Sequence, residues 1–202
     1  MKKCRLCRRE RTKLFLKGER CFSPKCPLER RGAVPPGVHG IRSGVRLSTY
    51  GRQLREKQKA KRLYGVSERQ LKNYFQKAIK EKGATGELLL RALERRLDNV
   101  VYRLGLAPSR ATARQLIVHG HVLVNNQKLT IPSYQVRLKD QVSLSEKALK
   151  MDKIQAWLAK KDWPVPSWLE RQGQIGRVVA WPERKEMPQE IDEHLIVEFY
   201  SR

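Results

Sequence analysis

The feature of the sequence that most constrains the fold is a set of four cysteines within the first 26 residues. Cys4 and Cys7 are separated by two residues, Cys21 and Cys26 by four, and thirteen residues lie between the pairs. Two close pairs of thiolates joined by a loop are suited to a tetrahedral structural zinc ion. The segment has too few apolar residues to fold around a hydrophobic core alone. The sequence therefore predicts one zinc ion bound by these four cysteines.

Positive charge is concentrated at the same end of the chain. The 202 residues include 44 Lys and Arg against 20 Asp and Glu, which gives a formal charge of +24. Residues 1–62 hold 20 of the basic side chains and only 4 of the acidic ones. Such an excess favours a polyanionic partner. Nucleic acid is a better candidate than a membrane surface, because the basic residues of 44–63 do not segregate from a broad apolar face.

No stretch of the sequence is suited to a membrane or to secretion. Nothing approaches the roughly 18 consecutive apolar residues of a membrane-spanning helix. No apolar stretch follows the basic N-terminus, as it would in a secretory signal. We therefore expect a cytoplasmic protein without a membrane partner, in which the cysteines stay reduced and can bind metal.

Capping residues and glycines divide the rest of the chain into predicted elements. Residues 33–40 are rich in Pro and Gly and predict a linker. Alternating apolar residues predict hairpins over 122–131 and 136–144, followed by a short helix capped by Ser145. Four helices are predicted before these hairpins, each ending next to a glycine, over 49–64, 67–82, 85–104 and 108–119.

The pattern is weaker in the last quarter of the chain. Residues 152–185 mix tryptophan, proline and glycine, and they predict irregular structure with one strand near 175–180. The last eleven residues, 192–202, form an apolar amphipathic segment that must pack against another part of the protein. Their pattern is compatible with a helix or with a strand.

The segment 95–125 and the hairpin after it carry a pattern suited to RNA. Arg110 and Arg114 are one turn apart and share a face of a predicted helix. His121 and Lys128 follow on the adjoining hairpin. A short helix with two arginines beside a small antiparallel sheet presents donors at a spacing suited to phosphates.

The charged residues at the start of this segment allow two interpretations. Arg95, Arg96 and Asp98 lie close together on the predicted helix 85–104. Ion pairs on the protein surface are one interpretation, and we favour it for Asp98. For Arg95 and Arg96, contact with RNA is an equal alternative.

The same segment resembles a known RNA-binding module. Residues 95–125 are similar to the αL motif of the family of the fourth protein of the bacterial small ribosomal subunit. Four other segments resemble members of the same family, at 14–21, 35–40, 55–60 and 197–202. The resemblance therefore extends over essentially the whole chain.

The resemblance implies a role in the ribosome. Members of the family bind the five-prime domain of 16S rRNA, nucleate assembly of the subunit body and contribute to translational accuracy. They contact small-subunit proteins five and twelve, and some repress the mRNA of their own operon. The resemblance thus implies a cytoplasmic location in the small subunit without homo-oligomers. The four cysteines place the chain among the zinc-binding members.

Two other classes of protein fit the sequence less well. An enzyme would need a second set of functional residues, but the sequence has only four histidines and no phosphate-binding glycine loop, H-E-x-x-H or G-x-S-x-G motif. The alternative is a zinc-containing regulator that binds RNA or DNA outside the ribosome. Residues 13–20 are too short and irregular for the recognition helix of a DNA-binding regulator.

The sequence therefore predicts an α+β protein that is not an enzyme. A zinc-stapled N-terminal segment and linker span 1–41, a mostly helical rRNA-binding domain spans 42–90 and 186–202, and an inserted α/β RNA-binding module spans 91–185. The residues expected to contact RNA lie on the basic helix with its lead-in and on the module. They are Arg42, Arg46, Arg52, Arg55, Lys57, Lys59 and Arg62, and then Arg95, Arg110, Arg114, His121 and Lys128.

Overall fold

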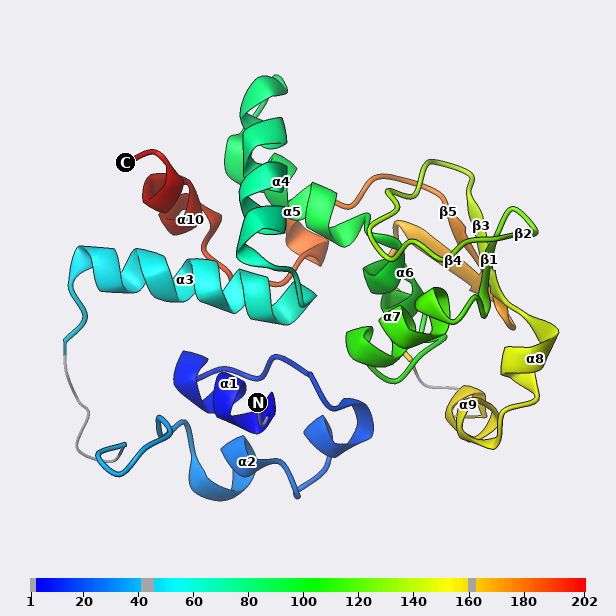
Figure 1. Ribbon diagram of the computed structural model, residues 1–202, viewed down its shortest axis with the longest axis horizontal. Coiled ribbons are helices and arrows are strands. Elements are labelled where there is room, and N and C mark those ends of the chain that lie inside the picture. Colours follow the sequence, from blue (N-terminus) through cyan, green and yellow to red (C-terminus); the bar gives the residue numbers. More distant parts are fainter. Residues whose placement is uncertain (1–2, 41–45, 160–162) are drawn as a thin grey trace. The chain divides into compact units, whose positions relative to one another are not determined.

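The computed structural model describes residues 3–40, 46–159 and 163–202 (Figure 1). The chain divides into two compact units, one of Met1–Leu89 with Pro188–Arg202 and one of Leu90–Met187. The predicted boundaries at 90/91 and 185/186 lie one and two residues away, and the segment 1–41 belongs to the first unit. Helices in both units and an antiparallel sheet in the second make the fold α+β, as predicted.

The first unit is helical in its described residues. Its C-terminal segment, which was compatible with a helix or a strand, is the helix α10 (Glu193–Tyr200), which packs along α3 (Thr49–Tyr64). Ile196 is buried in this contact region, which explains the apolar side of the segment. The elements are α1 (Lys3–Glu10), the short 3-10 helix η1 (Gly18–Cys21), α2 (Pro27–Arg31), α3 (Thr49–Tyr64), α4 (Glu68–Lys80), the first part of α5 (Thr85–Glu94) and α10 (Glu193–Tyr200).

Local capping explains where α3 and α4 end and begin. Gly65 ends α3 in the left-handed conformation (φ +63°) that glycine adopts most easily. Ser67 and Gln70 form the predicted capping box at the start of α4. α4 ends at Lys80, two residues earlier than predicted, because Glu81 is in an extended conformation.

The second unit combines helices with a five-stranded antiparallel sheet. α6 (Leu97–Arg103) packs against α7 (Arg110–Val118). The spatial order of the strands is β2 (Gln127–Lys128), β1 (Val122–Val124), β3 (Gln141–Leu144), β5 (Ile175–Val178) and β4 (Leu169–Gln172). The helical elements are α6 (Leu97–Arg103), α7 (Arg110–Val118), α8 (Glu146–Leu149), α9 (Asp152–Leu158) and the 3-10 helix η2 (Arg184–Glu186). The strands are β1 (Val122–Val124), β2 (Gln127–Lys128), β3 (Gln141–Leu144), β4 (Leu169–Gln172) and β5 (Ile175–Val178).

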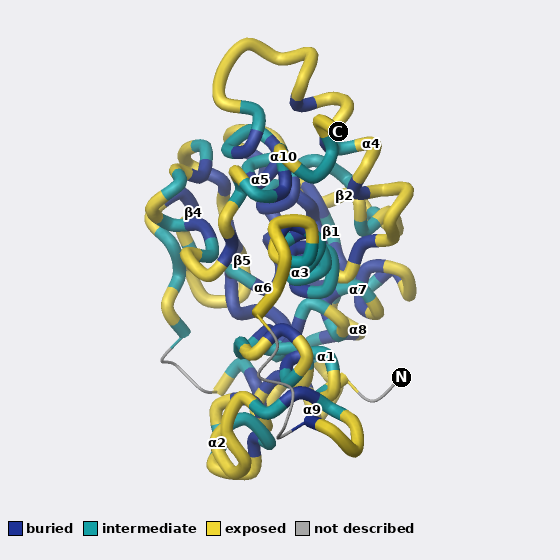
Figure 2. Tube along the Cα trace, turned by 90° about the vertical axis from the view of Figure 1, so that its left-hand side faces the viewer, coloured by how far each residue is buried: buried dark blue, intermediate teal, exposed yellow. Residues whose placement is uncertain are grey.

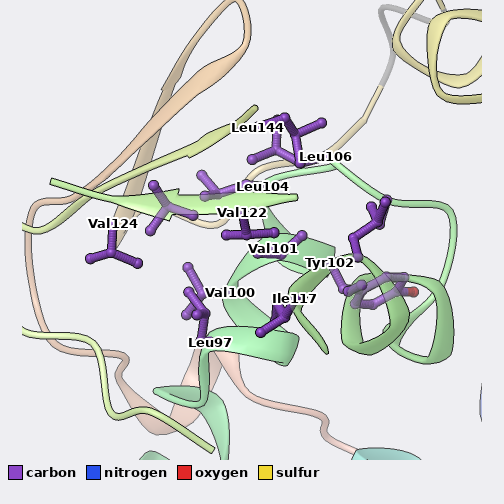
Figure 3. Close-up of a cluster of buried hydrophobic side chains, with 14 of the residues drawn as sticks. Leu97, Val100, Val101, Tyr102, Leu104, Leu106, Ile117, Val122, Val124 and Leu144 are labelled. Atoms are coloured by element: carbon purple, nitrogen blue, oxygen red, sulfur yellow. The ribbon is translucent and has the colours of Figure 1, made fainter. Parts of the chain in front are cut away.

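The core of the second unit lies between α6, α7 and the sheet. Residues 97–102 of α6 are all buried, so this helix runs through the interior (Figure 2). Ile117 from α7 and Val122 from β1 contribute to the same cluster of apolar side chains (Figure 3). Burial of this cluster is the main stabilising term of the unit, and it fixes α7 relative to β1.

The predicted helix 85–104 is interrupted in the structure. Arg96 separates α5 from α6 in an extended conformation (φ −64°, ψ 137°) and forms an isolated β-bridge with Gln135. The backbone N–H of Leu97 donates to the carbonyl of Tyr134 at 2.9 Å instead of continuing the helix. Leucines recur at helical spacing on both sides of Arg96, so the apolar pattern does not predict the interruption.

The first predicted hairpin is present in a shorter form. Asn125 and Asn126, both with positive φ (50° and 63°), join β1 to β2, as in a type I′ turn. β2 ends at Lys128, so the predicted continuation to residue 131 is wrong.

The second predicted hairpin, 136–144, is wrong. Only its second half forms a strand, β3, which pairs with β1 and β5. The N–H of Val136 donates to the carbonyl of Arg95 at 3.0 Å, next to the interruption between α5 and α6. Lys139, with φ +69°, then turns the chain into β3. A contact distant in sequence therefore replaces the local pairing.

The region 152–185 is more regular than predicted. It contains the expected strand, β5, but also α9 and β4, which were not expected. β4 pairs with β5 from Leu169↔Val178 to Gln172↔Ile175, and Gly173 (φ +61°) lies in the turn between them. The second hairpin of the unit is therefore at 169–178.

Candidate nucleic-acid interface

α3 carries five of the twelve residues that were predicted to contact RNA, and four of the five bind other parts of the first unit. Arg55 and Arg62 both pair with the carboxylate of Glu10 in α1, and Arg55 Nη1 lies 3.2 Å from Glu10 Oε1. Burial raises the pKa of Glu10, although Arg55 and Arg62 act to lower it. Burial also lowers the pKa of Arg55. Ion pairs of these two arginines with Glu10 therefore link α3 to α1.

Two lysines of α3 also bind their own unit. Lys57 is buried, and its Nζ lies 2.7 Å from Glu68 Oε1 and 4.1 Å from the centroid of the Phe199 ring. Lys59 Nζ donates to the carbonyl of Glu190 at 2.7 Å. A carboxylate and an aromatic ring enclose the ammonium group of Lys57, so its charge already has partners inside the unit, and its contact with RNA stays a prediction.

Two other predicted residues of this region, Arg46 and Arg52, lie around the start of α3. Arg46 and Arg52 are exposed, and neither forms an ion pair with a described side chain. Arg42 lies outside the described residues. Arg46 and Arg52 are therefore the predicted residues of this group whose charge is accessible to a ligand.

α4 presents basic residues that were not predicted from the sequence. Arg69, Lys72, Lys77 and Lys80 are all exposed, and none of them has an ion pair within the described ranges. The residues that α4 buries are apolar and lie on the other side of the helix. The signal was present in the sequence, since this apolar side repeats with a helical period and no acidic residue follows Glu68 within the helix.

In the second unit, one buried carboxylate binds two arginines. Asp98 Oδ2 lies 2.8 Å from Arg96 Nη2 and 3.0 Å from Arg114 Nε. The ion pair favoured for Asp98 is therefore present, but it is buried, and Arg96 belongs to it. Arg114 keeps 36% of its side chain exposed, so its guanidinium is fixed in direction and still accessible to solvent.

Arg110 lies on the same face of α7 and is held in a similar way. Its Nε donates to Asn99 Oδ1 at 2.7 Å, and its guanidinium lies 4.5 Å from the centroid of the Tyr102 ring. Asn99 is itself fixed by hydrogen bonds of 2.8 Å to the carbonyl and the carboxylate of Glu94. A guanidinium that is already ordered loses little conformational entropy when it binds a phosphate.

Arg95 has contacts within its own unit, and its contact with RNA stays a prediction. Its Nε and Nη2 donate to the carbonyl of Val136 at 3.2 and 3.1 Å. Its guanidinium carbon lies 3.9 Å from the centroid of the Trp181 ring. The carbonyl and the ring fix this side chain within its own unit.

His121 and Lys128 lie at the far end of α7 from Arg110. His121 is half-buried, and its ring is nearly parallel to that of His119. Lys128 is exposed on β2, and its side chain passes so close to Gly120 that a Cβ there would collide with it. Arg110 and Arg114 therefore lie along α7, whereas His121 and Lys128 lie beyond its C-terminal end.

The four cysteines line one small cavity between α1, η1 and α2. All are free thiols, and the backbone N–H of Lys17 donates to Cys21 Sγ at 3.4 Å. Burial raises the pKa of the Cys7 and Cys21 thiols. Across the described residues, no group of three or more His, Cys, Asp or Glu side chains is arranged to hold a metal ion. The structure therefore gives no support to the zinc-stapled segment beyond placing four suitable donors around one cavity.

The sequence matches two known domains. They are the ribosomal protein S4/S9 N-terminal domain over residues 1–94 and the S4 domain over residues 95–142. The small ribosomal subunit protein uS4 of Natranaerobius thermophilus is 52% identical over 202 residues, which cover 98% of this chain and 96% of that relative. The uS4 proteins of Thermus thermophilus and Thermodesulfovibrio yellowstonii are 50% and 54% identical with the same coverage. The chain belongs to the uS4 family.

Membership of the uS4 family determines the class of protein. The chain is a structural protein of the small ribosomal subunit and not an enzyme. The S4 domain match includes α6, α7, β1 and β2, so Arg110 and Arg114 lie within it. Among the described residues, no helix is long and apolar enough to cross a membrane.

Proposed function

We propose that this uS4 protein is a primary binder of 16S rRNA, which contacts the five-prime domain and nucleates assembly of the subunit body. The observation that carries the proposal is the exposed basic side of α4, where Arg69, Lys72, Lys77 and Lys80 have no acidic partner among the described residues. Cations without an internal partner are available to phosphates. The oriented arginines of α7 supply a second contact surface.

The recognition that we propose is of RNA shape. The major groove of an A-form helix is too narrow for side chains, so Lys and Arg bind phosphates and 2′-hydroxyl groups instead. Each phosphate contact releases counterions, which makes the affinity strongly dependent on salt. Each unit of the protein has its own set of accessible cations. Binding two RNA segments at once holds them in their assembled arrangement without any chemical reaction.

Three finer parts of the proposal come from membership of the family. We infer that the protein contacts small-subunit proteins five and twelve, that it contributes to translational accuracy, and that it binds the mRNA of its own operon. The family match over 98% of the chain supports these inferences. Each has a separate test: reconstitution with the two proteins, a misreading assay, and binding to the operon leader RNA.

The experiment that tests rRNA binding is a competition. The full chain, prepared with zinc, is bound to the five-prime domain of 16S rRNA in the presence of an equally long unrelated RNA at physiological salt. We expect a preference for rRNA that persists at salt concentrations that remove the competitor. Equal binding would mean that the net charge of +24 accounts for the affinity, and it would contradict the proposal. A preference for duplex DNA would favour the alternative of a regulator outside the ribosome.

We also propose that Cys4, Cys7, Cys21 and Cys26 hold one structural zinc ion. Four thiols around one cavity have the donor chemistry of a closed zinc site, which leaves no coordination position for catalysis. Leu14 and Pro35 are the buried aliphatic residues among residues 3–40, so a core of apolar side chains does not account for the order of this segment.

Chelation tests the zinc proposal. Removal of zinc by a chelator should expose the backbone amides of residues 3–31 to hydrogen exchange while the amides of α4 and of the second unit stay protected. The measurement is hydrogen exchange by mass spectrometry, with zinc added back as a control. Unchanged exchange in 3–31 would contradict the zinc site, and loss of protection throughout the chain would contradict its local role.

A further inference from the structure

The second unit has a groove that Arg110 and Arg114 do not line. The groove has a volume of about 530 Å³ and lies between α7, His121 just before β1, and Met151 with the first turn of α9. Leu116 and Ile154 contribute its buried apolar part, and the partly exposed Met151 contributes a third apolar side chain. This volume is sufficient for one nucleotide.

The groove and the two arginines are on opposite faces of α7. Thr112, Gln115, Leu116 and His119 all line the groove, and their spacing of three, four and seven residues places them on one side of a helix. Arg110 lies two residues before the first of them, and Arg114 two residues after it, which places both on the other side. A ligand in the groove is therefore additional to the phosphate contacts already proposed.

Two imidazole rings line the groove at the end of α7. The rings of His119 and His121 are inclined by only 6° to each other, with centroids 6.4 Å apart. Gly120 between them has φ +71°, which reverses the chain. The N–H of His121 donates to Leu116 O at 2.8 Å, and its carbonyl accepts from Ser145 N at 2.9 Å. These hydrogen bonds therefore hold the backbone of both histidines in place before any ligand binds.

The polar side chains of the groove complete a binding site. Gln115, Asp152 and Lys153 line it and have no hydrogen bond or ion pair from their side chains within the described part of the chain. An amide and a carboxylate match the hydrogen-bonding edge of a base, and an ammonium group matches a phosphate. An apolar peptide would leave all three groups without partners, so we favour a nucleotide.

We propose that this groove binds one unpaired nucleotide of RNA, with its base against the imidazole rings of His119 and His121 and its phosphate at Lys153. Flat aromatic rings stack on bases of any sequence. This inference rests on the proposed binding to rRNA, and it adds recognition of a single-stranded nucleotide to the recognition of phosphates.

The test uses hexaadenylate RNA and a hexamer of the same backbone that lacks bases. Binding to the full chain is measured at about 0.5 M salt, where phosphate contacts contribute little. The variants are His119→Ala with His121→Ala, and His119→Phe with His121→Phe, which keeps aromatic rings. Val118→Ala is the matched control, because Val118 is exposed on α7 and does not line the groove.

We expect the double alanine variant to bind hexaadenylate about tenfold more weakly, and the double phenylalanine variant and V118A to stay within about threefold of the unmodified chain. The hexamer without bases should bind weakly to all of them. Equal binding of the two hexamers, or unchanged binding by the alanine variant, would overturn the proposal. Phenylalanine and alanine variants that are equally weak would also overturn stacking.

Binding of the unmodified chain to the five-prime domain separates this inference from the proposed function. A clear preference for rRNA together with unchanged hexaadenylate binding by the alanine variant would overturn the nucleotide site alone. Absence of a preference for rRNA would overturn the proposed function itself, and with it the inference that rests on it.

Discussion

α3 and α4 are consecutive basic helices of the same unit, but they use their charge differently. In α3, five of the six basic residues bind a carboxylate of the unit: Arg55, Lys57, Lys59, Lys61 and Arg62. In α4, no basic residue has such a partner among the described residues. Glu68, the acidic residue of α4, itself pairs with Lys57 and Lys61. Net charge therefore overstates the charge that a helix can offer to RNA.

The reason for the difference is the position of each helix in the unit. α3 packs against α1 and α10, so its basic side chains are enclosed by other elements and need partners there. α4 buries one apolar side and leaves the opposite side to solvent. Charges on that side need no internal partner, because water solvates them until a ligand replaces it.

The largest expected effect comes from removing charge from α4. The triple variant Arg69→Gln, Lys72→Gln, Lys80→Gln should bind rRNA on the order of 100-fold more weakly at physiological salt. The slope of log affinity against log salt should fall by about three, since three phosphate contacts are lost. Filter binding over a range of salt concentrations measures both. An unchanged slope would remove this side of α4 from the interface.

The matched variant removes the same charge from α3. Arg55→Gln, Lys59→Gln, Arg62→Gln should change the salt slope by less than one, but it should lower the free energy of unfolding by about 2 kcal/mol, because Glu10 stays buried without cations. Denaturant unfolding of both triple variants gives the comparison. If the α3 variant is as stable as the unmodified chain and binds RNA as weakly as the α4 variant, the contrast between the helices is wrong.

The two helices also show what the sequence can and cannot predict. Gly65 and the capping box of Ser67 and Gln70 are local signals, and they predicted the end of α3 and the start of α4 well. The partners of Lys57 could not be predicted in this way, because Phe199 is distant in the sequence and its contact depends on the packing of α10. The fold must therefore be known before basic residues of the sequence can be assigned as contacts with RNA.

The second unit shows the same limit at the level of secondary structure. Ser145 predicted the short helix α8 correctly, since its cap is local. The interruption at Arg96 could not be predicted, because it depends on pairing with Gln135 across the fold. At the candidate site, Arg110 and Arg114 were predicted from their spacing on one helix, whereas the buried carboxylate of Asp98 that orients Arg114 became visible only in the structure.

A smaller effect is expected from Lys57→Met. Methionine keeps the apolar part of the side chain but removes the charge that lies between Glu68 and the Phe199 ring, so the free energy of unfolding should fall by about 1 kcal/mol. Lys61→Met is the matched control, because Lys61 pairs with the same carboxylate from a more exposed position. Its effect should be a few tenths of a kcal/mol. A rise in stability for K57M would mean that burial of the ammonium outweighs its partners.

The smallest effect is the dependence of stability on pH through Glu68, whose side chain is 45% exposed. Burial acts to raise the pKa of Glu68, but hydrogen bonds from Lys57, Lys61 and Tyr200 outweigh it and lower the pKa below the ordinary value of 4.5. Glu68 therefore stabilises the fold above that value, and this contribution is lost as the pH falls through the lower pKa of the folded state. Burial raises the pKa of Glu10, so the contribution of Glu10 has the opposite sign and decreases as the pH rises.

The variant Glu68→Gln separates these two contributions. Between pH 6 and 7 it should be less stable than the unmodified chain, and the difference should shrink as the pH falls below about 4.5, because the carboxylate then loses its charge in both states of the unmodified chain. Denaturant midpoints at a series of pH values measure this difference directly. A constant difference in stability across the series would show that the lysines of α3 do not depend on the carboxylate of Glu68. The lysines of α3 would then be as available to RNA as the basic residues of α4.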